Sequence, residues 1–215
     1  FEAFLRDRLQ SGQRKFLVVP LFFGQSRALT SFIPDIVSSL QAKFGHFKLT
    51  LADVLCPLPD GEQRLARILC DNIETTLHEH GITCSRVILV DHGSPTREVV
   101  AVRELLASHM RQMLGPGVTL YEAVMERRQG SEYDFTGRLL EEVLAELANS
   151  EDDTPVVLSM LFLSPGRHAG RGGDITSIRD RVVAANPSLQ AVITPLIGEH
   201  PGLVTILKQR LENAL

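Results

Sequence analysis

Two histidines stand just beyond the ends of two apolar runs of the chain. His92 follows the run Arg86–Asp91, and His168 lies in the loop after the run 156–163. Imidazole nitrogens bind divalent metal ions, and with an unperturbed pKa of about 6.5 they also collect protons near neutral pH. The two histidines are therefore candidate metal ligands and candidate catalytic bases.

The two apolar runs place these histidines at one edge of a sheet. Each run is typical of a buried parallel strand, and each is followed by a helical pattern. The carboxyl ends of parallel strands meet at the edge where open α/β folds bind ligands. We therefore expect His92 and His168 to face the same cleft.

The loop that carries His168 is rich in glycine and contains two arginines. Arg167 and Arg171 lie within the stretch 166–173, which leads into a predicted helix from Asp174. Guanidinium groups and free amides near a helix start suit carboxylates or phosphates. The loop lacks the lysine of a nucleotide-binding P-loop and the GxGxxG spacing, so no nucleotide is expected.

Three other polar groupings have simpler interpretations. Asp91, His92 and Ser94 resemble the parts of a hydrolase triad, but neighbours on one loop seldom converge, and no Gly-x-Ser-x-Gly elbow is present. His78 and His80 lie two apart on a predicted helix, where they do not face each other. The pair Arg127-Arg128 either extends a cationic rim or is simply solvated.

Strand and helix signals alternate from residue 86 onward. Ser94 is expected to cap a helix of about 18 residues that has Pro95 as its first residue. Such alternation predicts an α/β fold with a mostly parallel sheet flanked by helices. Strands are predicted at 86–91, 118–125, 156–163 and 189–197, and the later helices at 136–148, from about 174, and over the last residues.

The first part of the chain repeats the later part. Residues 16–27 match the strand and loop that lead to Arg167, and residues 51–58 match 189–196. We infer an internal duplication, with a partial first repeat at 1–85 and a complete second repeat at 86–215.

The first repeat lacks the features that carry the chemistry. Nothing in it matches residues 86–134, and Ala28 stands where the second repeat has His168. Because the chain also begins with Phe1, we expect that roughly 50 residues, the length of the unmatched stretch, precede it in the native protein. The truncated lobe should expose or pair a sheet edge, which favours a homodimer. The second repeat should carry the chemistry.

Composition excludes several classes of protein. The chain is 44% hydrophobic and 22% charged, and its net charge of -4 argues against nucleic-acid binding. It contains neither an apolar stretch of the ~18 residues needed to span a membrane nor a signal-peptide pattern. The three cysteines form no CxxC site or disulfide framework. A cytoplasmic protein with free thiols is expected.

Five motifs stand out together: Val90-Asp-His92-Gly-Ser94, Leu161-Phe-Leu163, Gly166-Arg-His168-Ala-Gly170, Gly173-Asp174-Ile175 and Pro195-Leu-Ile-Gly198-Glu-His200-Pro201. In their order and spacing they resemble the sirohydrochlorin chelatases, the class II chelatases of siroheme and cobalamin biosynthesis. The resemblance covers 86–215 as a whole unit and 1–85 in part. It implies two pseudo-symmetric α/β lobes, the first one incomplete here, with a tetrapyrrole cleft between them.

The resemblance also implies an activity and a set of residues. The activity is insertion of cobalt or ferrous iron, as a divalent metal substrate, into sirohydrochlorin or a related tetrapyrrole without a nucleotide. His92 and His168 would bind the metal and act in catalysis. Glu126, kept in Val124-Met125-Glu126 where the family has Phe-Leu-Glu, would join them. The expected substrate contacts are Ser94, Arg167, Gly170 and Arg171.

Two departures from the family pattern keep a second function open. Pro95 replaces the arginine that the family has after His-Gly-Ser, and the first repeat has lost its histidine. The alternative to a chelatase is a carrier or sensor of the same fold, which binds metal or tetrapyrrole without catalysing insertion.

Overall fold

The computed structural model describes residues 1–215, which fold into two compact units. The smaller unit comprises Phe1–Asp60 and Thr205–Leu215, and the larger one Gly61–Val204. These units differ from the predicted repeats, because helix α3 (Gln63–His80) belongs to the larger unit and most of α7 (Gly202–Ala214) to the smaller one. The boundary of the repeats at residue 85 remains an inference from the sequence.

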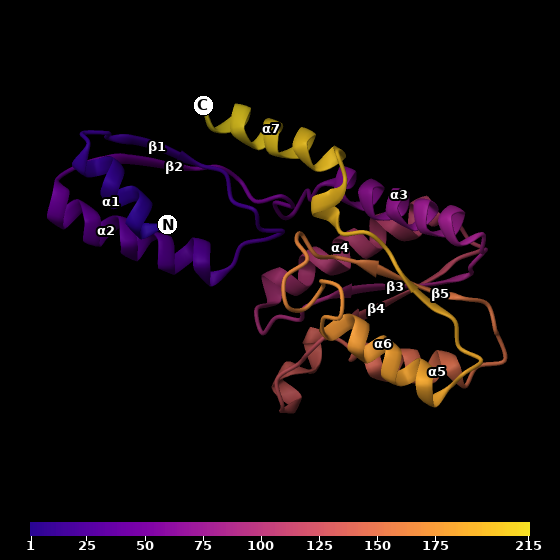
Figure 1. The fold of residues 1–215 in the computed structure, drawn as a ribbon. Coiled ribbons are helices and arrows are strands. Elements are labelled where there is room, and N and C mark those ends of the chain that lie inside the picture. Colours follow the sequence, from indigo (N-terminus) through magenta and orange to yellow (C-terminus); the bar gives the residue numbers. More distant parts are fainter. The chain divides into compact units, whose positions relative to one another are not determined.

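The larger unit is built on a parallel sheet with the strand order β4-β3-β5-β6. Figure 1 shows how helices cover this sheet. The two central strands, β3 and β5, are buried along their whole length, as their continuous apolar sequences predict. The strands are β3 (Arg86–Asp91), β4 (Thr119–Val124), β5 (Val156–Met160) and β6 (Ala191–Ile193).

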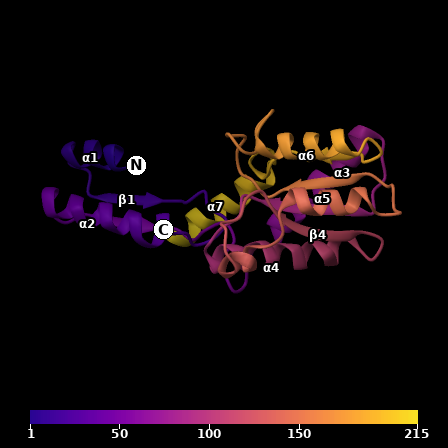
Figure 2. The same cartoon turned by 90° about the horizontal axis from the view of Figure 1, so that it is seen from below.

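Helices flank this sheet in two pairs. α3 contacts α4 (Arg97–Leu114), whereas α5 (Leu140–Ala148) contacts α6 (Asp174–Ala185). The pairs lie on opposite sides of the sheet in Figures 1 and 2. Ile88 and Val90 of β3 share a core cluster with α5 and α6, so the alternate residues of the strand, Asp91 included, face the α3–α4 side. The expected α/β fold with parallel sheets flanked by helices is confirmed.

The helix after β3 starts later than expected. It begins at Arg97 with Thr96 at its N-cap, so the prediction of Ser94 as the cap and Pro95 as the first helical residue is wrong. The Ser94 hydroxyl oxygen instead accepts the amide N–H of Thr96 at 3.1 Å. Such a local turn holds residues 94–96 outside the helix.

The predicted helix 136–148 is also interrupted near its start. A 3-10 segment, η2 (Ser131–Thr136), ends at Gly137, whose φ of 117° is incompatible with a continuing right-handed helix. α5 then begins at Leu140. The strands predicted at 156–163 and 189–197 begin close to the expected places but end earlier, at Met160 and Ile193.

The smaller unit has a sheet of only two parallel strands, β1 (Lys15–Val18) and β2 (Lys48–Leu51). A π-helix, η1 (Ala28–Phe32), precedes α2, and an apolar core joins α1 and α2 to the sheet. Because the first lobe is expected to be incomplete, we expect it to have fewer strands than the second. The smaller unit has a two-stranded sheet and the larger unit a four-stranded one. Besides most of α7, the helices of this unit are α1 (Glu2–Gln10) and α2 (Ile33–Phe44).

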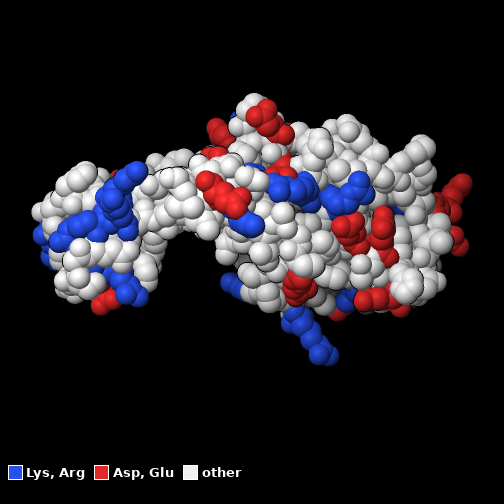
Figure 3. All heavy atoms as spheres, turned by 90° about the horizontal axis from the view of Figure 1, so that it is seen from above, with Lys and Arg blue, Asp and Glu red and all other residues white.

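Two further observations concern the surface charges and the apolar character of the helices. On the larger unit, acidic and basic side chains are interspersed over the face shown in Figure 3. No helix of the chain combines the length and the apolar character that crossing a membrane requires.

Candidate functional site

His92 and His168 lie next to each other at the carboxyl edge of the larger sheet. They come after β3 and β5, which are neighbouring strands, and their ring centroids are 4.7 Å apart. The rings meet edge to face, at an interplanar angle of 73°. Their side chains are 44% and 35% exposed, so both imidazoles are open to solvent on one side. The structure therefore brings the two predicted residues together.

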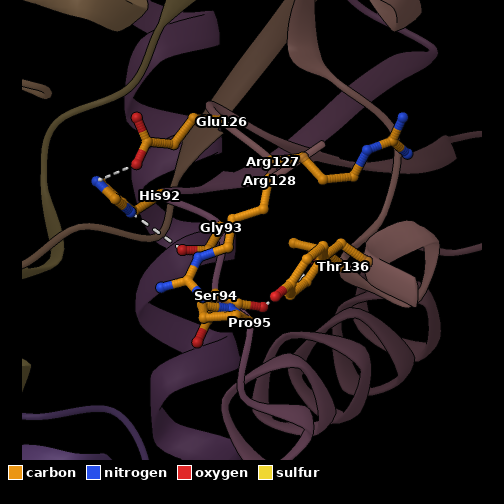
Figure 4. Close-up of a pocket in the computed structure, with 9 residues that line it drawn as sticks. His92, Gly93, Ser94, Pro95, Glu126, Arg127, Arg128 and Thr136 are labelled. Carbon is orange, nitrogen blue, oxygen red and sulfur yellow. Dashed lines mark hydrogen bonds and ion pairs between the residues drawn. The ribbon is translucent and has the colours of Figure 1, made fainter. Parts of the chain in front are cut away.

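The hydrogen bonds of His92 leave one ring nitrogen facing outward. Nδ1 lies 3.0 Å from the carbonyl oxygen of Gly93, which can only accept, so Nδ1 carries the proton. Nε2 lies 3.5 Å from Oε1 of Glu126 (Figure 4). A neutral His92 thus presents the Nε2 lone pair beside a carboxylate, which is an arrangement suited to a cation.

His168 has the same tautomer preference for a different reason. Its Nδ1 lies 2.6 Å from Oδ2 of Asp174, the first residue of α6. A carboxylate that accepts from Nδ1 fixes the tautomer and the ring orientation, as outer carboxylates do at metal sites. Both histidines therefore present Nε2 as the available nitrogen.

Backbone pairing brings Glu126 to His92. The ladder between β3 and β4 continues past the strands, with Met125 N–H donating to Asp91 at 2.8 Å and Glu126 N–H donating to His92 at 3.1 Å. Gly93 has a φ of 93°, and a Cβ there would collide with the carbonyl oxygen of Glu126. Only glycine fits at this crossing, so Gly93 sets the distance between the two functional loops.

A buried charge network supports the His92 turn from below. Oδ1 of Asp91 accepts the amide of Gly93 at 3.0 Å and lies 3.2 Å from Nη1 of Arg103. Arg103 is only 3% exposed, and it also donates to the carbonyl of Thr136 at 2.8 Å. Burial raises the pKa of Asp91, and the Arg103 charge opposes that rise.

Sequence reasoning missed Arg103, although a signal exists. The residue lies on the face of α4 that carries Val99, Leu106 and Met110. A guanidinium within an apolar helix face requires a buried partner. Asp91, which follows the apolar residues 87–90 of β3, is the carboxylate that this rule would have suggested.

A cavity of about 220 Å³ opens beside His92. Predicted substrate contact Ser94 lines it, whereas His168 and the loop 166–173 do not. The lining residues are His92, Gly93, Ser94, Pro95, Glu126, Arg127, Arg128, Tyr133 and Thr136.

The glycine-rich loop before α6 uses two of its amides for hydrogen bonds within the loop. The amide of Gly170 donates to Gly166 at 3.0 Å, and that of Gly173 donates to Gly170 at 2.9 Å. A Cβ at Gly170 would lie 2.7 Å from the Gly166 oxygen, so glycine is needed here for the tight fold of the loop. These two amides are satisfied within the loop, and the substrate contact expected at Gly170 stays a prediction.

The two arginines of that loop project outward. The Arg167 side chain is 84% exposed, and its Nε lies 3.8 Å from the Asp174 oxygen that also contacts His168. Arg171 is exposed as well. Both guanidinium groups are accessible near His168, and their role toward a substrate stays a prediction.

The possible metal-ligating side chains of the chain, His, Cys, Asp and Glu, form no cluster of three or more. Two of the three cysteines have perturbed thiols, and burial raises the pKa of the Cys70 thiol to about 11. Burial raises the pKa of the Cys84 thiol in the same direction. The thiols are therefore protonated near neutral pH, which makes them weak ligands.

Solved structures of similar fold extend over nearly the whole chain. SirB from Bacillus subtilis with Fe3+ has a TM-score of 0.74 at 16% identity, covering 100% of this chain and 77% of that chain. The sirohydrochlorin chelatase SirB from Bacillus subtilis subspecies spizizenii in complex with cobalt has a TM-score of 0.69 at 15% identity, covering 100% and 75%. These likenesses establish a shared fold.

A third structure and the family comparison point the same way. CbiX, described as the terminal enzyme for biosynthesis of siroheme in denitrifying bacteria, has a TM-score of 0.61 at 16% identity, covering 96% of this chain and 79% of that chain. No curated protein matches the sequence. The sequence model of the CbiX family matches residues 86–214, more than half of the chain. The chain therefore belongs to the CbiX family, as the resemblance of its motifs to sirohydrochlorin chelatases predicts.

Proposed function

We propose that the chain is a sirohydrochlorin chelatase that inserts cobalt or ferrous iron into its tetrapyrrole substrate. The observation that carries this proposal is the imidazole pair, whose ring centroids lie 4.7 Å apart with Nε2 of each ring available. Membership of the CbiX family and the fold shared with metal-bound SirB structures support it.

The reaction places two demands on the site. The divalent ion must be held loosely enough to be passed on, and the two protons displaced from the pyrrole N–H groups must be accepted. Two imidazoles without a third enclosing protein ligand meet the first demand, because the remaining coordination positions stay open. Imidazole and carboxylate donors accept both cobalt and iron, so this donor set permits either metal.

The neighbouring carboxylates meet the second demand. Glu126 is 65% exposed beside Nε2 of His92, so it can take a proton from the substrate or from His92 and release it to water. Asp174 holds Nδ1–H of His168 and stabilises that ring if Nε2 becomes protonated. We assign the catalytic role to His92, His168 and Glu126, and the metal-binding role to the two histidines.

The carboxylates of the tetrapyrrole substrate require cationic side chains around this site. Arg167 and Arg171 are exposed and close in sequence to His168, and Ser94 lines the cavity beside His92. We propose that the two arginines contact the periphery of the tetrapyrrole. Gly170 supports the two arginines indirectly, by permitting the tight turn of their loop. Its own amide already donates to the carbonyl oxygen of Gly166.

The test measures metallation of sirohydrochlorin with Co²⁺ and with Fe²⁺, monitored by absorbance, for the wild type and for His92→Ala and His168→Ala. Each variant should lose about 100-fold or more of the catalysed rate, since proton transfer and metal positioning are both removed. His46→Ala, which alters an exposed histidine of the smaller unit, is the control.

Two results would contradict the proposal. Near-normal rates in both histidine variants would remove these residues from the site. Binding of metal or tetrapyrrole by the wild type without any acceleration over the spontaneous rate would favour the carrier or sensor function. The Co²⁺ and Fe²⁺ rates from the same assay identify the preferred metal.

A further inference from the structure

The cavity beside His92 contains two consecutive arginines in different situations. The guanidinium of Arg127 donates to the carbonyl of Gly137 at 3.1 Å and lies 3.7 Å from Asp134. Its side chain is 26% exposed and points away from the opening (Figure 4). Arg127 therefore holds the η2 segment in place and is not available for a ligand.

Arg128 differs from Arg127 in the direction and in the partners of its side chain. Figure 4 shows its side chain extending across the cavity toward Ser94. No carboxylate of the chain lies within ion-pair distance of it, and its guanidinium carbon lies 5.6 Å from the ring centroid of Tyr133. A cation over an aromatic face keeps its charge and loses side-chain freedom. The Arg128 guanidinium thus lies near the Tyr133 ring and has no anionic partner within the chain.

The opposite wall supplies a hydrogen-bond donor. The Ser94 oxygen accepts the amide of Thr96, and this leaves its hydroxyl proton able to donate. The one carboxylate lining the cavity, Glu126, is drawn to Nε2 of His92, away from the Arg128–Ser94 side. An anion between Arg128 and Ser94 would therefore meet a positive charge and a donor.

The size of the cavity limits what it can hold. Pockets that enclose a whole small ligand typically measure about 300–1,000 Å³, whereas this one measures about 220 Å³. It admits a short carboxylate side arm but not a macrocycle. A macrocycle with an arm in the cavity would have its body outside, on the side where His92 presents Nε2.

We propose that this cavity is a subsite for one peripheral carboxylate of the substrate, held by the Arg128 guanidinium on the Tyr133 ring and by the Ser94 hydroxyl. The proposal rests on the proposed chelatase function and deepens it. It assigns Arg128 a role that the outward-facing Arg167 and Arg171 do not fill, namely to fix the substrate relative to His92.

The test measures binding of metal-free sirohydrochlorin by fluorescence titration. Arg128→Ala should weaken binding about tenfold or more, because a charge-assisted contact to a carboxylate is lost. Arg128→Lys should recover only part of the loss, since lysine keeps the charge but cannot form a two-pronged contact or stack equally well. Tyr133→Leu should weaken binding less than Arg128→Ala, because the charge remains.

The matched control is Arg138→Ala, which removes an exposed arginine paired with Glu146 and should leave binding unchanged. In metallation assays Arg128→Ala should raise KM and leave kcat within about threefold, as expected for a residue that binds the substrate periphery. Fully methyl-esterified sirohydrochlorin should bind the wild type and Arg128→Ala equally.

Failure of this proposal is distinct from failure of the proposed function. If the wild type catalyses metallation but Arg128→Ala binds sirohydrochlorin as tightly as the wild type, only the subsite assignment is overturned. If the wild type neither binds nor metallates sirohydrochlorin, both the chelatase function and the carboxylate subsite are overturned. Equal losses in Arg128→Ala and Arg138→Ala would show a general charge effect and overturn the subsite.

Discussion

Two parallel strand-helix-strand segments of this chain differ in the residues that connect the first strand to the helix. In the smaller unit β1 leads through η1 into α2 and then β2, and in the larger unit β5 leads into α6 and then β6. The larger unit places His168 and Asp174 between strand and helix, 2.6 Å apart. In the smaller unit the corresponding residues are Ala28 and the exposed Asp35.

This difference separates what the architecture needs from what the chemistry needs. The smaller unit forms its parallel pair and its apolar core without a histidine-carboxylate pair. The His168–Asp174 contact is partly exposed and joins a loop to a helix start, so it contributes little to burial. We infer that it is retained in the larger unit to orient Nε2 of His168.

The units also differ in their buried charges. The larger unit has β3, whose last residue Asp91 pairs with Arg103 beneath the His92 turn, whereas the two-stranded sheet has no strand in the corresponding place. A support of this kind is costly to break from one side, because one charge stays buried without its partner. Substitutions in the Asp91–Arg103 network therefore test most directly how the two units differ.

Arg103→Met is expected to have the largest effect. It leaves Asp91 buried without its cation, and breaking a buried ion pair from one side costs about 3–5 kcal/mol of unfolding free energy. Urea unfolding measures the loss. The loss should shrink when Asp91→Asn is added, because the uncompensated charge is then removed as well.

The control for this prediction is Arg181→Ala. Arg181 pairs with Glu141 on the surface, where both side chains are more than half exposed, so its removal should cost below ~1 kcal/mol. A similar small cost for Arg103→Met would show that the network under His92 is not a stabilising feature of the larger unit.

These contrasts show what sequence patterns could and could not predict. The alternation of strands and helices and the meeting of His92 with His168 derive from apolar periodicity and from the geometry of parallel sheets. Neither depends on the details of side-chain packing.

The features that sequence patterns missed depend on local hydrogen bonding. Ser94 closes a turn with Thr96 instead of capping a helix, because the same hydroxyl can satisfy either amide. The amides of Gly170 and Gly173 turn inward onto their own loop, which a count of glycines cannot show. The differing roles of Arg127 and Arg128 depend on where Gly137 and Tyr133 lie in space.

Asp174→Asn should have an intermediate effect. The amide keeps an oxygen near Nδ1 of His168 but loses the carboxylate charge of this outer contact. Loss of such an outer partner typically lowers metal affinity about 10–100-fold. Co²⁺ titration of the metal-free protein measures the affinity.

Asp35→Asn provides the matched control in the smaller unit. It removes a carboxylate from the corresponding position at the start of α2, where residue 28 is alanine. Its Co²⁺ affinity should equal that of the wild type. Equal losses in Asp35→Asn and Asp174→Asn would mean that net charge, and not contact with His168, governs metal binding.

Ala28→His should have the smallest effect, although it restores the residue that the smaller unit lacks. Residue 28 opens a π-helix, Asp35 is exposed seven positions later, and β1 pairs only with β2, so no strand on its other side carries a second histidine as β3 does for β5. A single imidazole without a partner is a weak metal site. The Co²⁺ stoichiometry from calorimetry should therefore remain that of the wild type, and the unfolding free energy should fall only by about 0.5 kcal/mol, the difference in helix propensity. A second bound Co²⁺ ion would contradict this prediction. It would show that the smaller unit already provides the rest of a metal site and differs from the larger unit there by one side chain.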